Sequence, residues 1–341
     1  MSEPLSPAKI FETARGFMSA KVLLVATKLG LFDALANGPL TGSQIRERLG
    51  LHPRAIPDFL DALLALGMLE RNGEGPAALY ANTPETARFL VRASEAYVGG
   101  ALEMYDDRLF RFWTDLEEAL RTGKPQNEVK HAGTSMFEEL YREPARLEQF
   151  MAAMSGISRP NFVQLAERFD FAPYRTLCDV GGAAAELSCA VATRHPHLRC
   201  VSFDLPVVEP IARATIARRG LADRVTTAAG DFFRDPVPRA DVITMGMILH
   251  DWNLEKKKAL IRAAYDALPE GGAFIAVEHL IDDARRQNVF GLLVSLNMLI
   301  EFGDAFDFTG ADFASWCSDA GFKRSEVLAL GGPASAAIAY K

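Results

Sequence analysis

The strongest constraint on the fold is an alternation of strand-like and helix-like segments that begins near Arg175. The apolar runs TLCDVGG, CVSFDLP, VTTAAGDFF, DVITMGMIL and AFIAVEHLI are mostly separated by stretches with helical spacing. Strands that alternate with helices form a parallel sheet covered on both faces. The final runs, RSEVLAL and SAAIAYK, flank a Gly-Gly-Pro turn and predict an antiparallel hairpin. We therefore predict an α/β fold with a Rossmann-like, doubly wound, mostly parallel sheet that ends in an antiparallel hairpin.

The first part of the chain has a different pattern, with apolar residues at helical spacing. AKVLLVATKLGLFDAL predicts one amphipathic helix. LTGSQIRERLG predicts a second, with Thr41 as its N-cap and Gly50 as its stop, and AIPDFLDALLALGMLER predicts a third that ends near Gly67. The stretch MLERNGEGPAALYANT then predicts two short strands around a turn. Helices followed by a hairpin are typical of a winged helix, so a mainly α winged-helix domain should precede the sheet.

A chain of 341 residues is too long for one ordinary hydrophobic core. We expect a winged-helix domain over residues 1–100, linking helices over residues 101–170, and the α/β domain over residues 171–341. The linking region is expected to be helical and carries aromatic side chains at Phe110, Phe112, Trp113, Phe137, Tyr141 and Phe150.

Charge and hydropathy exclude several partner classes. The net charge of −7 gives no general attraction to nucleic acid or to an anionic membrane. The start, MSEPLSPAKIF, lacks the pattern of a secretion signal, and no apolar run reaches membrane-spanning length. We expect a cytoplasmic protein that binds neither nucleic acid nor membrane.

A winged helix leaves a DNA-binding regulator as an alternative. Its recognition helix would have to be basic, whereas PRAIPDFLDALLALGMLER is apolar and carries Asp58 and Asp61 beside Arg54. Such a helix suits a contact between two subunits better, which favours a homodimer.

Polar residues follow the strands of the predicted sheet. Ligands of open parallel sheets bind outside the carboxyl ends of the strands. In chain order these ends carry Gly181 and Gly182, Asp204, Asp231 and Phe232, His250 and Asp251, and Glu278 and His279. Any single aspartate there could simply cap the next helix. Together, the groups are those needed to hold a nucleoside and to transfer a proton beside it.

The nature of the nucleoside follows from what the first turn lacks. GGAAAE is not a full GxGxxG and contains no lysine or arginine, and the chain has no GxxxxGK[ST] loop. A cofactor without phosphate fits better, and S-adenosylmethionine is the common one. The cysteines are spaced too widely for a CxxC site, and we expect no metal.

The pieces DVGG, FDLP, GDFF, LHDW, ALPEGG, VEH and AGF occur in this order and resemble the caffeate/acetylserotonin-type small-molecule O-methyltransferases. The resemblance covers essentially the whole chain. It implies dimerisation through the winged-helix domain, S-adenosylmethionine as cofactor and S-adenosylhomocysteine as product. The cofactor contacts that it implies are Gly181, Gly182, Asp204, Leu205, Asp231, Phe232 and Met245. It also implies that His250 is the general base, oriented by Glu278 and Asp307.

Proton chemistry explains why a histidine would stand at this strand end. A hydroxyl is a poor nucleophile while it keeps its proton, and an imidazole can accept that proton near neutral pH. A carboxylate on the other ring nitrogen fixes the tautomer and supports the imidazolium. The alternative is that His250 only caps the following helix, and for Asp251 we expect the N-cap role.

The chain departs from the family pattern at three places. Ala183-Ala184-Ala185 stands where the family has the last three residues of GGGTG, so two glycine positions carry a Cβ. Asp307 and Phe308 stand where the family has the glutamate and arginine of an ERT motif, and Gly246 replaces a frequent lysine. Weaker cofactor binding, or loss of methyl transfer, would be the consequence to test.

The substrate should lie among mostly apolar side chains, which suits a flat or apolar molecule. The predicted substrate-binding residues are Phe150, Met154, Met247, Asn297, Met298 and Phe302. Glu301 and Asp304 flank this region, and we expect them to be solvated. A small-molecule hydroxyl, aromatic or from secondary metabolism, is the favoured acceptor. A sulfur, nitrogen or carbon acceptor, or a non-methylating enzyme on the same fold, remains an alternative.

Overall fold

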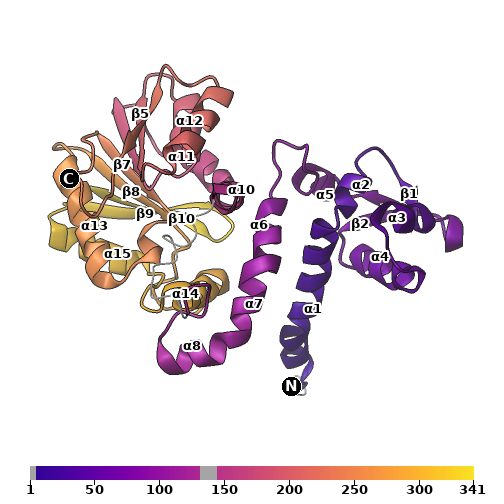
Figure 1. Cartoon of the computed structure of the whole chain (residues 1–341). Coiled ribbons are helices and arrows are strands. Elements are labelled where there is room, and N and C mark those ends of the chain that lie inside the picture. The colour runs from indigo at the N-terminus through magenta and orange to yellow at the C-terminus, as the bar shows by residue number, and fades with distance from the viewer. Residues whose placement is uncertain (1–4, 131–143) are drawn as a thin grey trace. The chain divides into compact units, whose positions relative to one another are not determined.

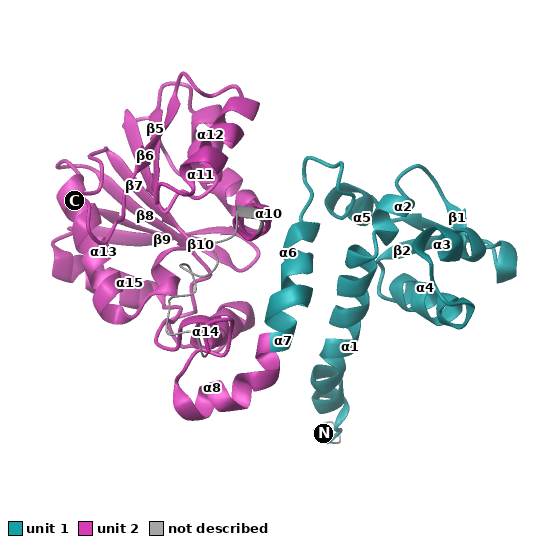
Figure 2. Ribbon diagram, in the orientation of Figure 1, with its two compact units in different colours: residues 1–111 teal, residues 112–341 magenta. Residues whose placement is uncertain are grey.

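The structure, a computed structural model, describes residues 5–130 and 144–341. The chain forms two compact units, residues 1–111 and residues 112–341 (Figure 2). The division into three parts at residues 100 and 170 stays a prediction. Within the linking region, Phe137 and Tyr141 lie outside the described residues.

The first unit contains a set of short helices and a small sheet. Its elements are α1 Ala8–Lys28, α2 Leu31–Ala34, β1 Leu40–Thr41, α3 Gly42–Leu49, the 3-10 turn η1 Pro53–Ala55, α4 Ile56–Ala65, β2 Leu69–Asn72, the 3-10 turn η2 Gly75–Ala77, β3 Leu79–Asn82, α5 Pro84–Phe89, α6 Gly99–Met104 and the π-turn η3 Tyr105–Leu109 (Figure 1). The strands pair in the order β1-β3-β2. Helices followed by a hairpin confirm the predicted winged-helix pattern.

The caps of α3 are those predicted. The Thr41 hydroxyl accepts a hydrogen bond from the Gln44 N–H, the Gln44 side chain accepts one from the Thr41 N–H, and Gly50 ends the helix in the left-handed conformation. Gly67 likewise follows α4 with a φ of +73°.

The first predicted helix is wrong in one respect. AKVLLVATKLGLFDAL is not continuous, because α1 ends at Lys28 and α2 begins at Leu31. Gly30 lies between them with a φ of 73°, a left-handed conformation that stops a helix at little cost for glycine. The apolar period runs on across the break, so periodicity alone did not show it.

The second unit carries the large sheet. Its elements are α7 Phe110–Phe112, which spans the junction, the 3-10 turn η4 Trp113–Asp115, α8 Leu116–Thr122, α10 Pro144–Arg168, β4 Thr176–Val180, α11 Glu186–Arg194, β5 Arg199–Asp204, α12 Glu209–Arg218, β6 Val225–Ala229, β7 Val242–Gly246, the 3-10 turn η5 Leu249–Asp251, α13 Leu254–Ala267, β8 Ala273–Glu278, α14 Val289–Phe302, α15 Gly310–Ala320, β9 Arg324–Gly331 and β10 Ala334–Tyr340.

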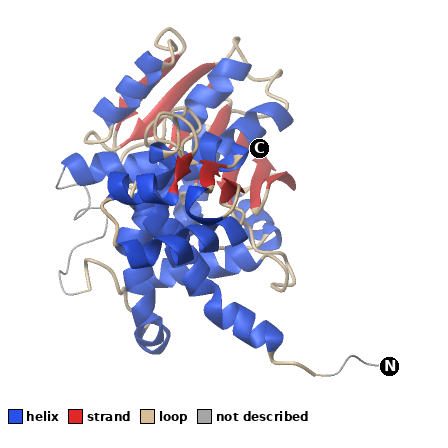
Figure 3. Cartoon of the chain, turned by 90° about the vertical axis from the view of Figure 1, so that its right-hand side faces the viewer, coloured by secondary structure: helices blue, strands red, loops and turns tan. Residues whose placement is uncertain are grey.

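The sheet has seven strands in the order β6-β5-β4-β7-β8-β10-β9. Strands β4 to β8 are parallel, and β10 pairs antiparallel with both β8 and β9, as predicted. Helices α10, α11 and α12 pack on one face, and α13 and α15 pack on the other (Figures 1 and 3). The order reverses between β4 and β7, so the crevice for a ligand lies at the carboxyl ends of these strands.

Within residues 5–130 and 144–341, no helix combines the length and the apolar character needed to cross a bilayer.

Candidate active site

The turn after β4 is shaped by close backbone approach. A Cβ on Gly181 would lie 2.3 Å from Ile248 Cδ1, and one on Gly182 would lie 2.2 Å from Ser202 Oγ. Neither position can carry a side chain without movement of its neighbours. Ala183 and Ala185 have φ values of 46° and 60°, so both predicted glycine positions do require the left-handed conformation. The turn therefore keeps its shape, with strain at two alanines.

Asp204 is bound to this turn. Its Oδ2 accepts a hydrogen bond from the Ala183 N–H at 2.8 Å, and its Oδ1 accepts one from the Leu205 N–H at 2.7 Å. Burial raises the pKa of Asp204, and these two N–H groups oppose the rise. The carboxylate is thus fixed at the end of β5, beside the glycine turn, where ribose hydroxyls could reach its remaining lone pairs.

Asp231 and Phe232 follow β6, as expected. The Asp231 Oδ1 accepts a hydrogen bond from the Phe233 N–H at 2.9 Å, so the carboxylate also shapes its own turn. The Phe232 ring meets Phe233 and Trp252 edge-on, with centroid distances of 4.9 and 6.1 Å. Contacts among these three aromatic rings therefore connect the turn after β6 to the segment that follows His250.

The remaining predicted cofactor contacts are Leu205 and Met245, and they differ in burial. Leu205 is partly buried and packs with Phe150 and Ala183 around the buried Met151. Met245 is fully buried in the core between the sheet and α13. The side chain of Met245 serves packing, which leaves its backbone as the part that lies near the crevice.

His250 lies in the turn η5, four residues beyond the end of β7, and is buried. Its Nδ1 lies 3.5 Å from Asp307 Oδ1, and its Nε2 lies 3.3 Å from Asp251 Oδ1. Burial opposes the imidazolium, but the charges of Asp251, Glu278 and Asp307 outweigh it and raise the pKa of His250. Both ring nitrogens thus face carboxylates, an arrangement suited to holding a proton.

Glu278 was expected to orient the imidazole of His250, but it binds the backbone of the turn η5 instead. Its Oε1 accepts a hydrogen bond from the Leu249 N–H at 2.9 Å, and burial raises its pKa. The carboxylate therefore holds the backbone next to His250, and its charge reaches the imidazole through space. Asp307, rather than Glu278, is the closer partner of Nδ1.

The expectation that Asp251 caps the next helix is wrong. Asn253 is the N-cap of α13, and its side chain accepts the Lys256 N–H. Asp251 instead ends the turn η5, which places its carboxylate on the imidazole. The 3-10 turn between strand and helix shifts the cap by two residues.

His250, Glu278 and Asp307 bring one ligand atom each within 4.8 Å of one another. Such a group could hold a metal ion, and it equally suits proton transfer. One Glu278 oxygen is already bound to a backbone N–H, which favours the second interpretation. The expected absence of a metal stays a prediction.

Lys257 is a further residue near this cluster, and it was not predicted from the sequence. This side chain is fully buried on α13, and its Nζ lies 3.8 Å from the centroid of the Phe306 ring. Burial lowers the pKa of Lys257 to about 8, while nearby carboxylates oppose the fall. The only sequence signal was a lysine at an apolar position of the helical repeat, inside a run of three lysines.

The predicted substrate-binding residues lie on two helices and in the link between β7 and η5. Phe150 and Met154 are half-buried on α10, Met247 precedes η5, and Asn297, Met298 and Phe302 are on α14. Met247 has a φ of 57°, a strained conformation of the kind found at functional sites. The Asn297 Oδ1 accepts a hydrogen bond from Trp113 Nε1 at 2.9 Å. Helix α14 packs against η5, but the grouping of all six residues around one substrate stays a prediction.

The two acidic residues that flank the predicted substrate region, Glu301 and Asp304, differ in burial. Glu301 is not solvated: it is buried, and its Oε2 accepts a hydrogen bond from Asn127 Nδ2 at 2.8 Å. Asp304 is exposed, as expected, and binds Asn253 Nδ2.

At Gly246 a Cβ would lie 2.7 Å from the Phe162 ring, so a lysine has no room there.

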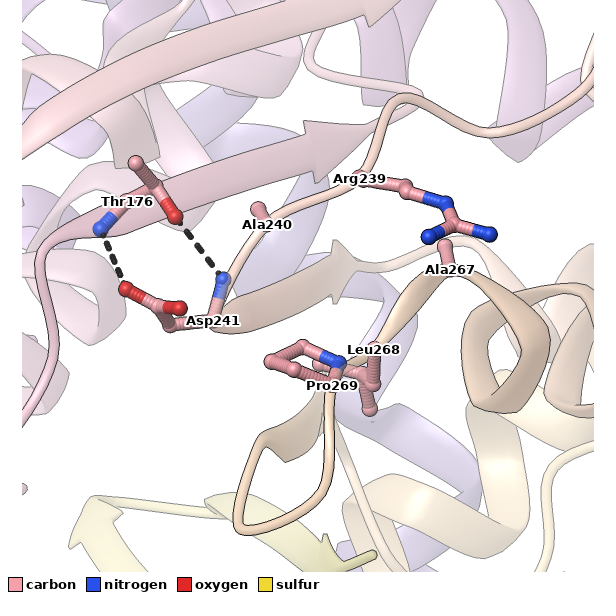
Figure 4. Close-up of a pocket in the computed structure, with 7 residues that line it drawn as sticks. All are labelled: Thr176, Arg239, Ala240, Asp241, Ala267, Leu268 and Pro269. Carbon is pink, nitrogen blue, oxygen red and sulfur yellow. Dashed lines mark hydrogen bonds between the residues drawn. The ribbon is translucent and has the colours of Figure 1, made fainter.

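A cavity of about 260 Å³ lies elsewhere, at the amino-terminal edge of the sheet (Figure 4). Asp241 and Thr176 exchange backbone and side-chain hydrogen bonds in its wall. Because ligands of this fold bind at the opposite edge, we do not assign this cavity to the active site.

Comparison with known proteins agrees with this geometry. Residues 113–323 match the model of the O-methyltransferase domain, and residues 11–92 match that of the O-methyltransferase dimerisation domain. The chain belongs to the O-methyltransferase family. This family uses S-adenosylmethionine.

Several members of the family resemble the chain over nearly its whole length. The tetracenomycin polyketide synthesis 8-O-methyl transferase TcmO of Streptomyces glaucescens is 40% identical over 98% of this chain and 97% of its own length. The 3-hydroxy-5-methyl-1-naphthoate 3-O-methyltransferase of Streptomyces sahachiroi is 34% identical over 96% and 92%. The structure of human N-acetylserotonin methyltransferase with S-adenosylmethionine has a TM-score of 0.91 at 28% identity, covering 100% and 99% of the two chains.

Proposed function

We propose that this chain transfers the methyl group of S-adenosylmethionine to a hydroxyl group of a fused-ring aromatic molecule, with His250 as general base. The observation that carries the proposal is the buried imidazole of His250 at the crevice, with a carboxylate at each ring nitrogen. Relatives named for polyketide and naphthoate O-methylation support this acceptor class.

The turn after β4 fits the proposed cofactor. Gly181 and Gly182 allow the backbone to pass close to Ile248 and Ser202, where a Cβ would clash. Asp204 is held beside this turn by two N–H groups. Gly181 and Gly182 would hold the amino acid part of the cofactor, Asp204 the ribose, and Leu205, Asp231, Phe232 and the Met245 backbone the adenine side. When bound, S-adenosylmethionine supplies a methyl group on a sulfonium, ready for in-line displacement.

The chain's own part in the reaction is to move and hold one proton. His250 Nε2 would accept the hydroxyl proton of the acceptor. Asp307 at Nδ1 and Asp251 beside Nε2 then stabilise the imidazolium. Glu278 keeps the turn in place through the Leu249 N–H. General-base catalysis of this kind contributes about 10²- to 10⁴-fold to a rate.

An amine acceptor is the second candidate. The N,N-dimethyltransferase OxyT of Streptomyces rimosus is 34% identical over 94% of this chain and 93% of its own length. An amine that is already neutral needs less help from His250, so the two acceptors can be told apart by the dependence of turnover on this residue.

The dimerisation domain supports a homodimer, formed through the first unit. Exposed apolar side chains on α1, at Ile10, Phe11, Phe17 and Met18, provide apolar surface for such a contact. The cytoplasmic location remains a prediction.

The test is methyl transfer from labelled S-adenosylmethionine to a panel of hydroxynaphthoates and tetracyclic phenols. We expect an O-methylated product with the wild-type protein and a loss of about 10²- to 10⁴-fold in His250→Gln. His52→Gln changes an exposed histidine of the first unit and should keep full turnover. Full turnover in His250→Gln, or a product methylated on nitrogen or sulfur, would overturn the proposal.

A further inference from the structure

Lys257 occupies a core position of α13. It lies on the buried face of the helix with Leu260, Ile261 and Ala264, whereas its neighbours Lys256 and Lys258 are exposed. An apolar residue would pack there without penalty. A charged side chain is almost never fully buried unless its charge is compensated, so the compensation has to be found nearby.

The contacts of Lys257 point toward the catalytic turn. Its Nζ donates a hydrogen bond to the carbonyl of Trp252, two residues after His250. The same ammonium lies 3.8 Å from the Phe306 ring centroid and 5.9 Å from that of Phe308, the two residues that flank Asp307. Lys257 therefore touches both segments that carry the partners of His250.

The surrounding charges explain why a cation is needed. Asp251, Glu278 and Asp307 are three acids around a single imidazole, and both Glu278 and Asp307 are about 1% exposed. One imidazolium cannot balance three buried carboxylates. The field of these acids, with that of Asp304, favours the ammonium form of Lys257 against its burial. Two further charged or titratable groups of the described residues act on the cluster. Glu301 on α14 is one of the charges that raise the pKa of the buried Asp251. His279 directly follows β8, and burial together with the charge of His250 lowers its pKa to about 4.

We propose that Lys257 is a positioning residue of the methyl-transfer site, whose buried ammonium partly balances the charges of Asp251, Glu278 and Asp307 and limits the proton affinity of His250. This inference rests on the proposed role of His250.

The charge balance fixes the direction of the effect. With Lys257 neutralised, the cluster becomes more negative by one unit, so His250 binds its proton more tightly. We expect the pKa of His250 to rise by about one unit in Lys257→Met and in Lys257→Gln. Lys257→Gln keeps a hydrogen-bond donor for the Trp252 carbonyl, so it separates the loss of charge from the loss of that bond.

The experiment follows the imidazole directly and needs no acceptor. The protein is labelled in its six histidines, His250 is assigned from the spectrum of His250→Gln, and its titration is recorded by NMR in wild type, Lys257→Met and Lys257→Gln. Lys258→Met, which removes an exposed lysine of the same helix paired with Asp319, is the matched control and should titrate like wild type.

The outcomes separate this inference from the proposed function. A higher pKa of His250 in both Lys257 variants, with an unchanged pKa in Lys258→Met, supports the inference. An unchanged or lowered pKa of His250 in either Lys257 variant overturns it. If neither variant folds, the wild-type lysine resonances decide, because an ammonium at pH 7 supports the proposal and a neutral amine overturns it. Binding of S-adenosylhomocysteine by each folded variant is measured alongside. Its absence in wild type would contradict the proposed function without affecting the titration result.

Discussion

The Nδ1 atom of His250 lies 3.5 Å from Oδ1 of Asp307, a little beyond the length of a good hydrogen bond. The resemblance to the family implies a glutamate at this position, and the side chain of an aspartate, shorter by one methylene, is consistent with this separation. The main-chain N–H of Asp307 donates to Ser295 Oγ at 3.1 Å, which ties its segment to α14. Orientation of the base thus depends on the packing of α14.

Asp307→Asn should lower kcat by roughly 10- to 100-fold, the range seen when a residue that orients a functional imidazole is lost. The amide keeps the shape but removes the charge that supports the imidazolium. Steady-state kinetics on the acceptor found in the screen measure this loss. Asp319→Asn, at an exposed position of α15, serves as control, and Asp307→Asn with wild-type kcat would contradict the assigned role.

The pH dependence of kcat/KM should show the raised pKa of His250. The free enzyme needs the neutral imidazole, so activity falls as pH drops through this pKa, and the midpoint should lie above the ordinary value of 6.5. Asp307→Asn removes one negative charge and should move the midpoint to lower pH. A midpoint at or below 6.5 in wild type, or movement in the opposite direction in the variant, would argue against the charge arrangement described here.

The alanines of the turn after β4 store strain that glycine would relieve. Ala183 and Ala185 have φ values of 46° and 60°. In this left-handed region, the backbone conformation of an L-residue costs roughly 1–2 kcal/mol. Glycine loses more chain entropy on folding, about 0.5–1 kcal/mol. Ala183→Gly and Ala185→Gly should each therefore raise the free energy of unfolding by about 0.5–1 kcal/mol.

Denaturant unfolding of the two variants measures this gain. Ala184→Gly is the matched control, because Ala184 is buried and has no positive φ. Ala184→Gly should lower the free energy of unfolding by about 0.5–1 kcal/mol. Destabilisation by all three substitutions would show that the turn is not strained.

The cap of α13 gives a test of the corrected assignment. Asn253→Ala removes the side-chain oxygen that accepts the Lys256 N–H and should cost about 1 kcal/mol of stability. Asp251→Asn should have little effect on the cap and should instead lower the pH midpoint of kcat/KM, because it removes a charge 3.3 Å from Nε2. Comparable loss of stability in both variants would restore Asp251 as a second cap.

The sheet and its hairpin could be predicted because strand and helix periods are local signals. The caps Thr41 and Gly50 were predictable for the same reason. The break at Gly30 was not, because apolar residues continue the helical period on both sides of it.

The candidate site was predicted as a set of strand ends, but not in its detailed contacts. Neither the η5 turn nor its consequences for Asp251 and Asn253 can be seen from residue types. Lys257 was hidden among three consecutive lysines, since only the helix phase in the folded chain determines which one is buried. Long-range partners such as Asp307 became visible only through the resemblance to a known family.

The most direct test of the central claim is titration calorimetry of the purified protein with S-adenosylmethionine and S-adenosylhomocysteine. Asp204→Ala removes the carboxylate proposed to hold the ribose, and Asp223→Ala changes an exposed aspartate as control. We predict micromolar binding of both nucleosides that is lost in Asp204→Ala and kept in Asp223→Ala. Failure of the wild-type protein to bind either nucleoside at millimolar concentration would contradict the account.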